Sequence, residues 1–433
     1  MAGSLYMGDL DSERYWGDDN LAKLPSFEDS SSLGIIHSMD ELLFPFCSKD
    51  GDVLITRFAF DNALKEYLYA AGFRFRCNSC DFHTEISDAK KTIFEIIAGD
   101  ESKLKDFLDS VKGCTYFSPY SIAPYSEILR EKVNFINSSP SFEAVKRVNS
   151  KEYSTILSKK LGFGSHSNIV YSSHELMIKG KELLEKGNFL IKELYGVSGK
   201  GNLLISSLKL LERIVKYVES SEAKGKACAF VIEEFLDREL DYSCGFIISE
   251  DGKTEIVSIQ KILNHQFAYG GSEAADENFI NFLYEKGYFE TIESISKELY
   301  KDGYFGEVCV DSMLVKSGAI APVIEINARK SMGFVNNRID SRLSRYGLKG
   351  NLMNINLGVP DDLKFEDILD KLEDKNILYH EGKEYGIIPV SSNTLFINRK
   401  LSGDITKSKI FKGRMYLSVI SKDTTEKEKL ING

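Results

Sequence analysis

Four residues in the C-terminal half have the types and spacing of a site for a metal ion and phosphate. In the string IEINAR, Glu325, Asn327 and Arg329 alternate with apolar or small residues, so they share one face of a strand. The upstream run GEVCVDSMLV carries Asp311, and a turn near 316–319 places Asp311 opposite Glu325. Facing carboxylates repel each other, and a divalent cation would remove that repulsion. Such oxygen ligands suit Mg²⁺, with Mn²⁺ as the alternative ion; the competing interpretation is a sheet face with its charges in water.

A second stretch, FLIKELYGVSGKGN at 189–202, has the composition of a phosphate-binding loop. Its strand carries Lys192, and the loop that follows is rich in small residues, among them Ser198, Gly199 and Gly201. Small residues let backbone N–H groups surround a polyphosphate, and lysine supplies positive charge. The spacing is not that of a Walker A loop. A flexible hairpin turn is the alternative.

A third stretch, VIEEFLDRELDYS at 231–243, is an apolar strand that runs into acidic residues. Its end can offer backbone N–H and C=O groups to a purine edge, and a nearby acid can bind ribose hydroxyls. The alternative is a strand end with solvated acids.

A fourth stretch, NHQFAYGGSEAAD at 264–276, could close over a site as a mobile substrate loop, or it could be an ordinary long connection. Its candidate contact residues are Tyr269, Gly270, Gly271 and Ser272.

The elements around these stretches predict an α/β region followed by an α+β region. Residues 1–33 are polar and acidic and predict an irregular lead-in. The run at 52–58 predicts a strand and 61–73 a helix, so residues 1 to about 140 resemble a small Rossmann-like domain without a dinucleotide-binding motif. A helix then begins with Asn149 as its expected N-cap. The strands beyond it lack strict βαβ alternation, which favours a largely antiparallel sheet.

The composition excludes several classes of protein. The chain has 433 residues, a net charge of −10 and a pI near 5.4, which argues against nucleic acid or an anionic membrane as the main partner. We see no signal peptide and no apolar run of 18 residues, so a cytoplasmic location is expected. Seven scattered cysteines are typical of reduced thiols. Cys77-x-x-Cys80-x-x-His83 offers three zinc ligands where four are needed, and thiols on a loop are the better interpretation.

In this order, the stretches resemble the ATP-grasp carboxylate–amine ligases over about residues 145–335. The matching motifs are NSKEYSTILSKKLG, IKELYGVSGKG, VIEEFLDRELDYS, GEVCVDSML and VIEINAR. The Glu-x-Asn-x-Arg string with an acid on the partner strand is the most specific of them. The resemblance implies an α+β ATP-grasp fold in which two subdomains clamp ATP.

The resemblance also implies a role for each candidate residue. Lys151 and Lys192 would contact ATP, with Lys192 and Arg329 stabilising charge at the reacting centre. Asp241 would bind the ribose, with Glu239 as the alternative because the sequence carries an extra residue there. The remaining implied contacts are the loop residues Ser198, Gly199 and Gly201, the adenine connector Glu233, Glu234, Phe235 and Leu236, and the Mg²⁺ ligands Asp311, Glu325 and Asn327.

Shorter motifs narrow the resemblance to ligases with a preceding pre-ATP-grasp domain, the group of the pheganomycin peptide ligase and the butirosin-type amino acid ligase. These motifs are WGDDNLAKLPSF, DVLITRF, SPYSIAPYSEILREKV and KGRMYLSVIS. The expected division is a pre-ATP-grasp domain at 1–145, an ATP-grasp domain at 146–335 with a hinge near 233–241, and a C-terminal extension at 336–433.

The group implies an ADP-forming ligase that makes an amide or peptide bond through an acyl phosphate in specialised metabolism. Its partners would be a small carboxylate and an amine, such as amino acids, peptides or a carrier-bound acyl group. The oligomeric state stays open, with a homodimer as one alternative. Two rivals stay open. One is an ATP-grasp phosphotransferase that stops at phosphate transfer, and the other is a non-catalytic nucleotide-binding regulator.

Overall fold

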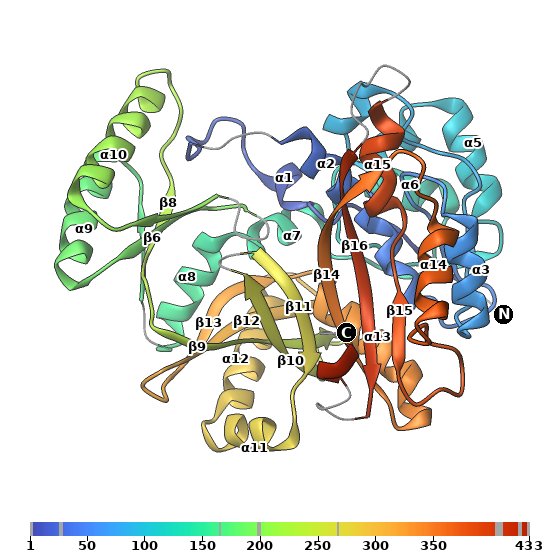
Figure 1. The fold of residues 1–433 in the computed structure, drawn as a ribbon. Helices are drawn as coiled ribbons and strands as arrows, with labels where there is room; N and C mark the ends of the chain where they lie inside the picture. Colours follow the sequence, from blue (N-terminus) through green and yellow to red (C-terminus); the bar gives the residue numbers. More distant parts are fainter. Residues whose placement is uncertain are drawn as a thin grey trace.

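The fold of the chain is described by a computed structural model. It describes residues 3–25, 29–163, 166–196, 201–265, 268–402, 410–422 and 427–430. Three sheets organise these residues, and Figure 1 shows them in sequence colours. The mixture of a parallel sheet with two antiparallel ones confirms the predicted α+β class with a Rossmann-like N-terminal region.

The first sheet is parallel and has the strand order β3-β2-β1-β4. Its strands are β1 Gly3–Tyr6, β2 Val53–Leu54, β3 Arg76–Cys77 and β4 Cys114–Phe117. The helices around it are α1 Glu13–Trp16, α2 Ser30–His37, η1 Met39–Phe46, α3 Asn62–Ala70, η2 Ile86–Lys90, α4 Ile93–Ala98, α5 Glu101–Ser110 and α6 Ser126–Val133. The predicted irregular lead-in is wrong for residues 3–6, because β1 pairs with both β2 and β4 in the middle of this sheet. Four residues are too few to show a periodic pattern.

The second sheet is small and antiparallel, with the order β5-β8-β6-β7. Its strands are β5 Ser167–Val170, β6 Phe189–Glu193, β7 Asn202–Ile205 and β8 Phe230–Glu234. Helices α9 Ser173–Lys186 and α10 Leu208–Glu222 cover one face of it (Figure 1). Apolar residues at helical spacing on α10, including Leu211, Val215 and Val218, are buried against this face. Helices α7 Phe142–Val148 and α8 Lys151–Lys160 lead from the first sheet to the second.

The third sheet is antiparallel and has eight strands in the order β13-β12-β9-β10-β11-β14-β16-β15. The strands are β9 Arg238–Ile248, β10 Thr254–His265, β11 Ala268–Ala274, β12 Gly306–Val315, β13 Ile320–Asn327, β14 Lys349–Pro360, β15 Gly386–Pro389 and β16 Ile410–Ser421. Its helices are α11 Glu277–Glu285, α12 Tyr288–Lys301, α13 Met332–Leu343, η3 Ser344–Tyr346, α14 Phe365–Asp374 and α15 Asn393–Ser402.

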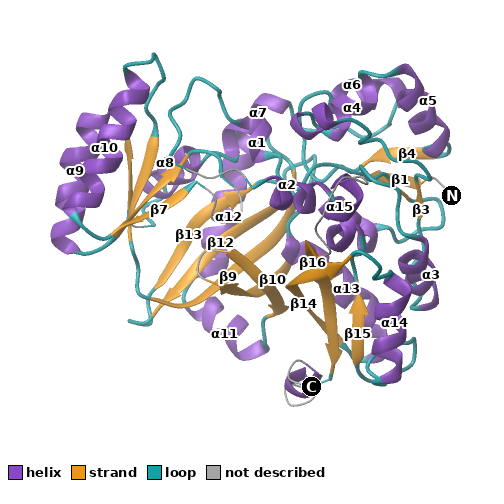
Figure 2. Ribbon diagram, turned by 45° about the horizontal axis from the view of Figure 1, so that its top comes forward, coloured by secondary structure: helices purple, strands orange, loops and turns teal. Residues whose placement is uncertain are grey.

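Helices cover the two faces of the large sheet unequally. Tyr288, Ile292 and Ile295 of α12 are buried with Tyr242 and Phe246 of β9, so α12 closes one face. On the other face α13 packs over β9, and Asp311 lies opposite Ser243 on this face. Figure 2 shows α13, α14 and α15 beside strands β14, β15 and β16 of the same sheet. The predicted C-terminal extension adds β14, β15 and β16 to this sheet. The boundaries at 145 and 335 stay predictions.

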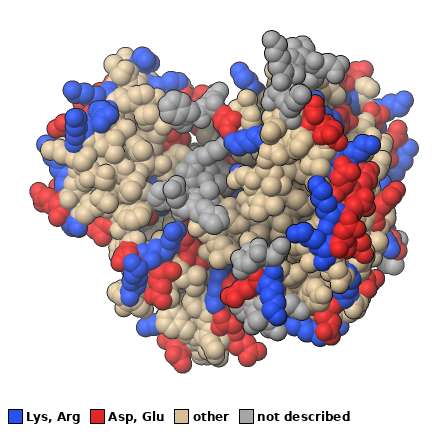
Figure 3. Space-filling view, in the orientation of Figure 1, with Lys and Arg blue, Asp and Glu red and all other residues tan. Residues whose placement is uncertain are grey.

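The charge distribution on the surface and the length of the helices concern the expected nucleic-acid and membrane partners. On the face drawn in Figure 3, lysine and arginine side chains are interspersed with aspartate and glutamate side chains. None of the helices in the described ranges combines the length and the apolar character needed to cross a bilayer.

Asp340 on α13 is a half-buried carboxyl group that should make stability depend on pH. It accepts a hydrogen bond from the Gly350 N–H at 2.6 Å, and burial raises its pKa to about 7. An unfolded aspartate titrates near pH 4, so between about pH 4 and 7 the folded protein keeps a proton that the unfolded chain has lost. The free energy of unfolding therefore falls as pH rises through this window.

We expect Asp340→Asn to be more stable than the natural protein at pH 8, by on the order of 1 kcal/mol. The difference should shrink toward pH 4, where both side chains are neutral. Urea unfolding at several pH values measures it. A difference that stays constant with pH would show that the ionisation of Asp340 is not its cause.

Candidate active site

The predicted pairing of the two acidic strands is confirmed. Asp311 of β12 lies opposite Glu325 of β13, and Cys309 lies opposite Asn327. The Asn327 amide donates to an Asp311 carboxylate oxygen at 2.9 Å. Two carboxylates and an amide therefore lie together on one face of the strand pair.

The two carboxylates differ in their electrostatic surroundings. Burial and the neighbouring Glu325 charge raise the pKa of Asp311 to about 7. Burial acts to raise the pKa of Glu325, but Lys151, Lys192 and Arg329 together outweigh it, and the net pKa of Glu325 is lowered. The repulsion between the two carboxylates therefore appears as the raised pKa of Asp311, and a bound cation would lower that pKa.

These residues fit a Mg²⁺ ion whose coordination is completed by other groups. Asp311 and Glu325 supply charged oxygens and Asn327 an amide oxygen, and Mg²⁺ in proteins commonly takes one or two carboxylates plus phosphates and water. In the part of the chain that the structure describes, no cluster of three or more His, Cys, Asp or Glu side chains could hold a metal ion. An ion here would therefore depend on the phosphates of a bound nucleotide.

Two buried lysines face this acidic strand pair. The Lys151 ammonium donates to Glu325 at 2.8 Å and to the Gly196 carbonyl at 3.2 Å, so it joins the acidic strand to the start of the glycine loop. Lys192 donates to Glu233 at 2.7 Å on the neighbouring strand of the small sheet. Both lysines lie where the two sheets approach each other, as expected for groups that bind phosphates between them.

Arg329 is held by residues of the N-terminal region that the sequence analysis did not identify. Its Nε donates to Glu13 at 2.7 Å, and Nη2 also contacts the same carboxylate oxygen. Nη1 donates to the Tyr120 hydroxyl at 3.2 Å, and Nη2 donates to Asn327 at 2.9 Å. Burial acts to lower the pKa of Arg329, but Glu13, Tyr120 and Glu325 together outweigh it, and the pKa is raised. No sequence pattern marks Glu13, which lies in the region expected to be irregular.

The neighbourhood of Arg329 also corrects one expectation. The N-cap of α8 is Ser150, whose hydroxyl accepts from the Tyr153 N–H, and not Asn149. Asn149 instead accepts from the Ala328 N–H at 2.8 Å and donates to the Ala328 carbonyl. It therefore fixes the backbone next to Arg329, a role that local sequence cannot distinguish from capping.

The predicted adenine connector joins β8 to β9. Glu233 and Glu234 end β8, and Phe235 and Leu236 follow. The N–H of Glu234 donates to the His166 carbonyl and that of Phe235 to the Asn188 carbonyl. Those two amides therefore already have partners within the small sheet.

The predicted ribose ligand Asp241 lies on β9, in contact with two neighbours. It accepts from Arg238 and from the Asn264 amide, both at 2.6 Å. Its charge contributes to the raised pKa of Asp311, so it belongs to the same electrostatic site. The alternative, Glu239, is exposed to solvent.

The glycine loop is described only at its ends, and Ser198 and Gly199 lie outside the described residues. Gly201 has a φ of +78°, a conformation that favours glycine. A Cβ added there would lie 3.2 Å from the Cβ and Oε2 atoms of Glu193. Glycine is therefore required at 201 both by backbone conformation and by contact.

We expect Gly201→Ala to weaken ATP binding about tenfold, because strain of this kind costs on the order of 1–3 kcal/mol. ATP titration measures the effect. Gly113→Ala is the matched control, since Gly113 has a φ of +87° and nothing within 4 Å of an added Cβ. Equal ATP affinity in both variants would argue against a role for the Gly201 contact.

The segment expected to be a mobile substrate loop is a strand. Tyr269, Gly270, Gly271 and Ser272 belong to β11, which pairs with β10 and with β14. The prediction was wrong because paired glycines in a sequence usually indicate flexibility. Gly271 instead allows the backbone of β14 to approach closely. A Cβ added at Gly271 would lie 2.5 Å from the Leu352 carbonyl oxygen. The Tyr269 hydroxyl contacts the Ser272 hydroxyl at 2.8 Å.

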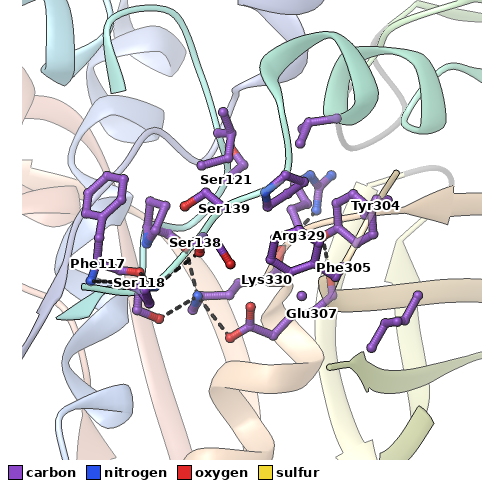
Figure 4. Close-up of a pocket in the computed structure, with 18 of the residues that line it drawn as sticks. Phe117, Ser118, Ser121, Ser138, Ser139, Tyr304, Phe305, Glu307, Arg329 and Lys330 are labelled. Atoms are coloured by element: carbon purple, nitrogen blue, oxygen red, sulfur yellow. Dashed lines mark hydrogen bonds and ion pairs between the residues drawn. The ribbon is translucent and has the colours of Figure 1, made fainter. Parts of the chain in front are cut away.

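A cavity of about 240 Å³ adjoins Arg329. It lies between the loop after β4, residues 137–140 and the ends of β9 and β12. Figure 4 shows Lys330 pointing toward Ser118 and Glu307 within it. The Lys330 ammonium donates to the Ser118 hydroxyl at 3.1 Å and the Pro119 carbonyl at 2.8 Å, and it lies 3.0 Å from the Glu307 carboxylate. The hydrogen bonds of Lys330 to Ser118 and Pro119 join the loop after β4 of the first sheet to the third sheet, next to Arg329.

The cysteine cluster has no metal-site geometry in the described residues. The Cys80 thiol lies 3.9 Å from an Asp106 oxygen, and the His83 ring stacks on Phe58. All seven cysteines are free thiols.

The chain is similar to known proteins in sequence and in fold. No protein-family model matches the chain. Among curated proteins, the chain is 25% identical over 203 residues to [butirosin acyl-carrier protein]–L-glutamate ligase of Niallia circulans. The match covers 44% of this chain and 45% of the relative, so the chain spans less than half the length of the curated relative that it matches.

Solved structures match over nearly the whole chain at low identity. Biotin carboxylase of Campylobacter jejuni with an ATP analogue matches at 13% identity and a TM-score of 0.54, covering 98% of this chain and 88% of that one. N5-carboxyaminoimidazole synthetase of Staphylococcus aureus with ADP matches at 13% identity and 0.53, covering 100% and 96%. The chain therefore has the ATP-grasp fold. Together with the curated relative, this confirms the predicted resemblance to ATP-grasp carboxylate–amine ligases.

Proposed function

We propose that the protein is an ATP-dependent carboxylate–amine ligase that forms an amide bond through an acyl phosphate. The observation that carries the proposal is the alignment of Asp311, Glu325, Asn327 and Arg329 on one face, with Lys151 donating to Glu325. Phosphate transfer between two anions requires such a concentration of positive charge and metal ligands. The butirosin relative and the ATP-grasp fold support the same class.

In the proposed first step, an oxygen of the substrate carboxylate attacks the γ-phosphorus of ATP, and the bond to the β-phosphate oxygen breaks to release ADP. Lys151 and Lys192 would hold the phosphates, and Arg329 would hold the incoming carboxylate. A Mg²⁺ ion bound by Asp311, Glu325 and Asn327 would neutralise phosphate charge during this step. Glu13 keeps Arg329 in place through its Nε and Nη2 atoms, while Nη1 donates to Tyr120 and Lys330. An incoming carboxylate would take over one of the Nη1 hydrogen bonds.

In the second step, the nitrogen of a neutral amine attacks the acyl carbon, phosphate leaves, and the nitrogen gives up a proton. The tetrahedral intermediate carries an oxyanion, which Arg329 would stabilise. Acyl phosphates react with water, so the site must be closed between the small and the large sheet. The cavity beside Arg329 has the volume for a small amino acid, and we assign it to one substrate.

The relative acts on an acyl-carrier protein and L-glutamate, so we propose a carrier-bound or free acid together with an amino acid as the substrate classes. Specialised metabolism, a cytoplasmic location and a homodimer are part of the same proposal. The test measures ADP release with Mg-ATP over a panel of amino acids, dipeptides and an acyl-carrier protein, alone and in pairs, with product masses.

ADP that appears only with a particular pair, with a product one water lighter than the sum, is the expected result. ADP with a single compound and a phosphorylated product would identify a phosphotransferase instead. ATP binding without turnover over the whole panel would favour the regulator.

A further inference from the structure

An extended N-terminal segment, residues 20–24, packs on the small sheet, and we call it the N-terminal strap. Its backbone joins the chain just before β8: the Ala22 N–H donates to the Ala227 carbonyl and the Ala227 N–H to the Asn20 carbonyl, both at 2.8 Å. Leu21 and Ala227 form a parallel β-bridge. Figure 1 shows the blue segment after α1 extending toward β8.

The side chains of the strap alternate between two faces, as those of a strand do. Ala22 and Leu24 are each 4% exposed and join the core beneath α9 and α10. Leu21 packs with Leu194 and Val231 in a separate cluster. The small sheet therefore has part of its core supplied from a distant part of the chain.

The strap also contacts the strand that leads into the glycine loop. The Leu24 N–H donates to the Glu193 carboxylate at 2.6 Å. Glu193 ends β6, and its own N–H donates to the Gly201 carbonyl at 2.8 Å. Its side chain lies against Gly201, where an added Cβ would be 3.2 Å away. Glu193 thus links the strap to both ends of the loop.

The other end of the same segment is anchored next to Arg329. Glu13 of α1 binds the Arg329 guanidinium, and the fully buried Trp16 donates from its indole nitrogen to the Ile122 carbonyl at 3.0 Å. Few residues separate these anchors from the strap. Residues 13–24 therefore connect Arg329 with Glu193 on the strand that leads into the glycine loop.

We infer that the N-terminal strap and Glu193 are positioning elements of the nucleotide site: they fix the ends of the glycine loop and so set the affinity for ATP. The inference rests on the proposed function for its ligand, ATP, but its structural part can be tested without a nucleotide. The test measures hydrogen exchange of the backbone amides in β6 and β7, because the strap contacts β6 through Glu193 and β6 pairs with β7.

The test compares Leu24→Ala with Leu183→Ala, a buried leucine of the same core that lies on α9. In nucleotide-free protein, hydrogen exchange of the amides in β6 and β7 should speed up about tenfold in Leu24→Ala relative to Leu183→Ala. ATP titration should show about tenfold weaker binding in Leu24→Ala only, which corresponds to about 1.4 kcal/mol. Glu193→Gln, which keeps the packing, should weaken ATP binding in the same direction and serves if Leu24→Ala fails to fold.

Unchanged exchange in β6 and β7, or exchange that rises while ATP affinity stays equal to that of Leu183→Ala, would overturn the inference. If the natural protein does not bind ATP, the proposed function is wrong. The exchange comparison still decides whether the strap holds these strands.

Discussion

Glu325→Gln should reduce turnover by about 10²–10³-fold, the size of effect seen when one preorganised electrostatic contact at a reacting centre is lost. The substitution removes one negative charge from the proposed metal ligands and keeps the shape of the side chain. The amide oxygen of glutamine can still accept from the Lys151 ammonium, which donates to Glu325 at 2.8 Å. Turnover with the identified substrate pair measures the effect.

The folded state should survive this change. Glu325 is one cause of the raised pKa of Asp311, so removing its charge relieves a repulsion while it weakens the pair with Lys151. These effects oppose each other, and the melting temperature should change by only a few degrees. Glu293→Gln is the control: it removes an exposed carboxylate on α12 that lies 3.9 Å from Lys297, and turnover should stay the same. Unfolding of Glu325→Gln at ambient temperature would show that Glu325 is part of a structural ion pair.

The site residues on β12 and β13 could be predicted from the sequence because their arrangement depends only on neighbouring residues. Alternation along one strand places Glu325, Asn327 and Arg329 on a face, and a short turn sets the register of Asp311 opposite them. Backbone geometry alone therefore brings these residues together. The antiparallel sheet, Lys151 at the start of α8 and Lys192 near the end of β6 follow from patterns of the same range.

The part contributed by distant segments could not be predicted. Glu13, Tyr120 and Asn149 reach Arg329 or its backbone through tertiary packing, and nothing in their local sequence distinguishes them from ordinary polar residues. The same holds for β1, whose four residues gain strand structure only because β2 and β4 lie on either side. Strand β11 was mistaken for a loop because glycine has two uses, flexibility and close approach, and only packing shows which applies.

Arg329→Lys keeps the positive charge but should reduce turnover by about 10²-fold or more and lower the stability. The guanidinium donates to Glu13 at 2.7 Å, to Tyr120 at 3.2 Å and to Asn327 at 2.9 Å, in directions fixed by its planar fork. A lysine ammonium cannot reproduce these directions. Glu13 is 4% exposed, and a buried carboxylate that loses its partner costs about 3–5 kcal/mol. Turnover and urea unfolding measure the two effects separately.

Arg57→Lys is the control for activity lost through stability alone. Arg57 donates from Nε to Asp9 at 2.8 Å in a buried pair of the N-terminal region, so the unfolding free energy should fall while turnover of the folded enzyme changes much less.

Glu13→Gln completes a double-mutant cycle with Arg329→Lys. If Glu13 acts by holding Arg329, its substitution lowers turnover in the natural background and has little further effect once residue 329 is lysine. Additive losses would mean that Glu13 acts independently of Arg329, and the N-terminal region would then contribute to the site by a route other than holding this side chain.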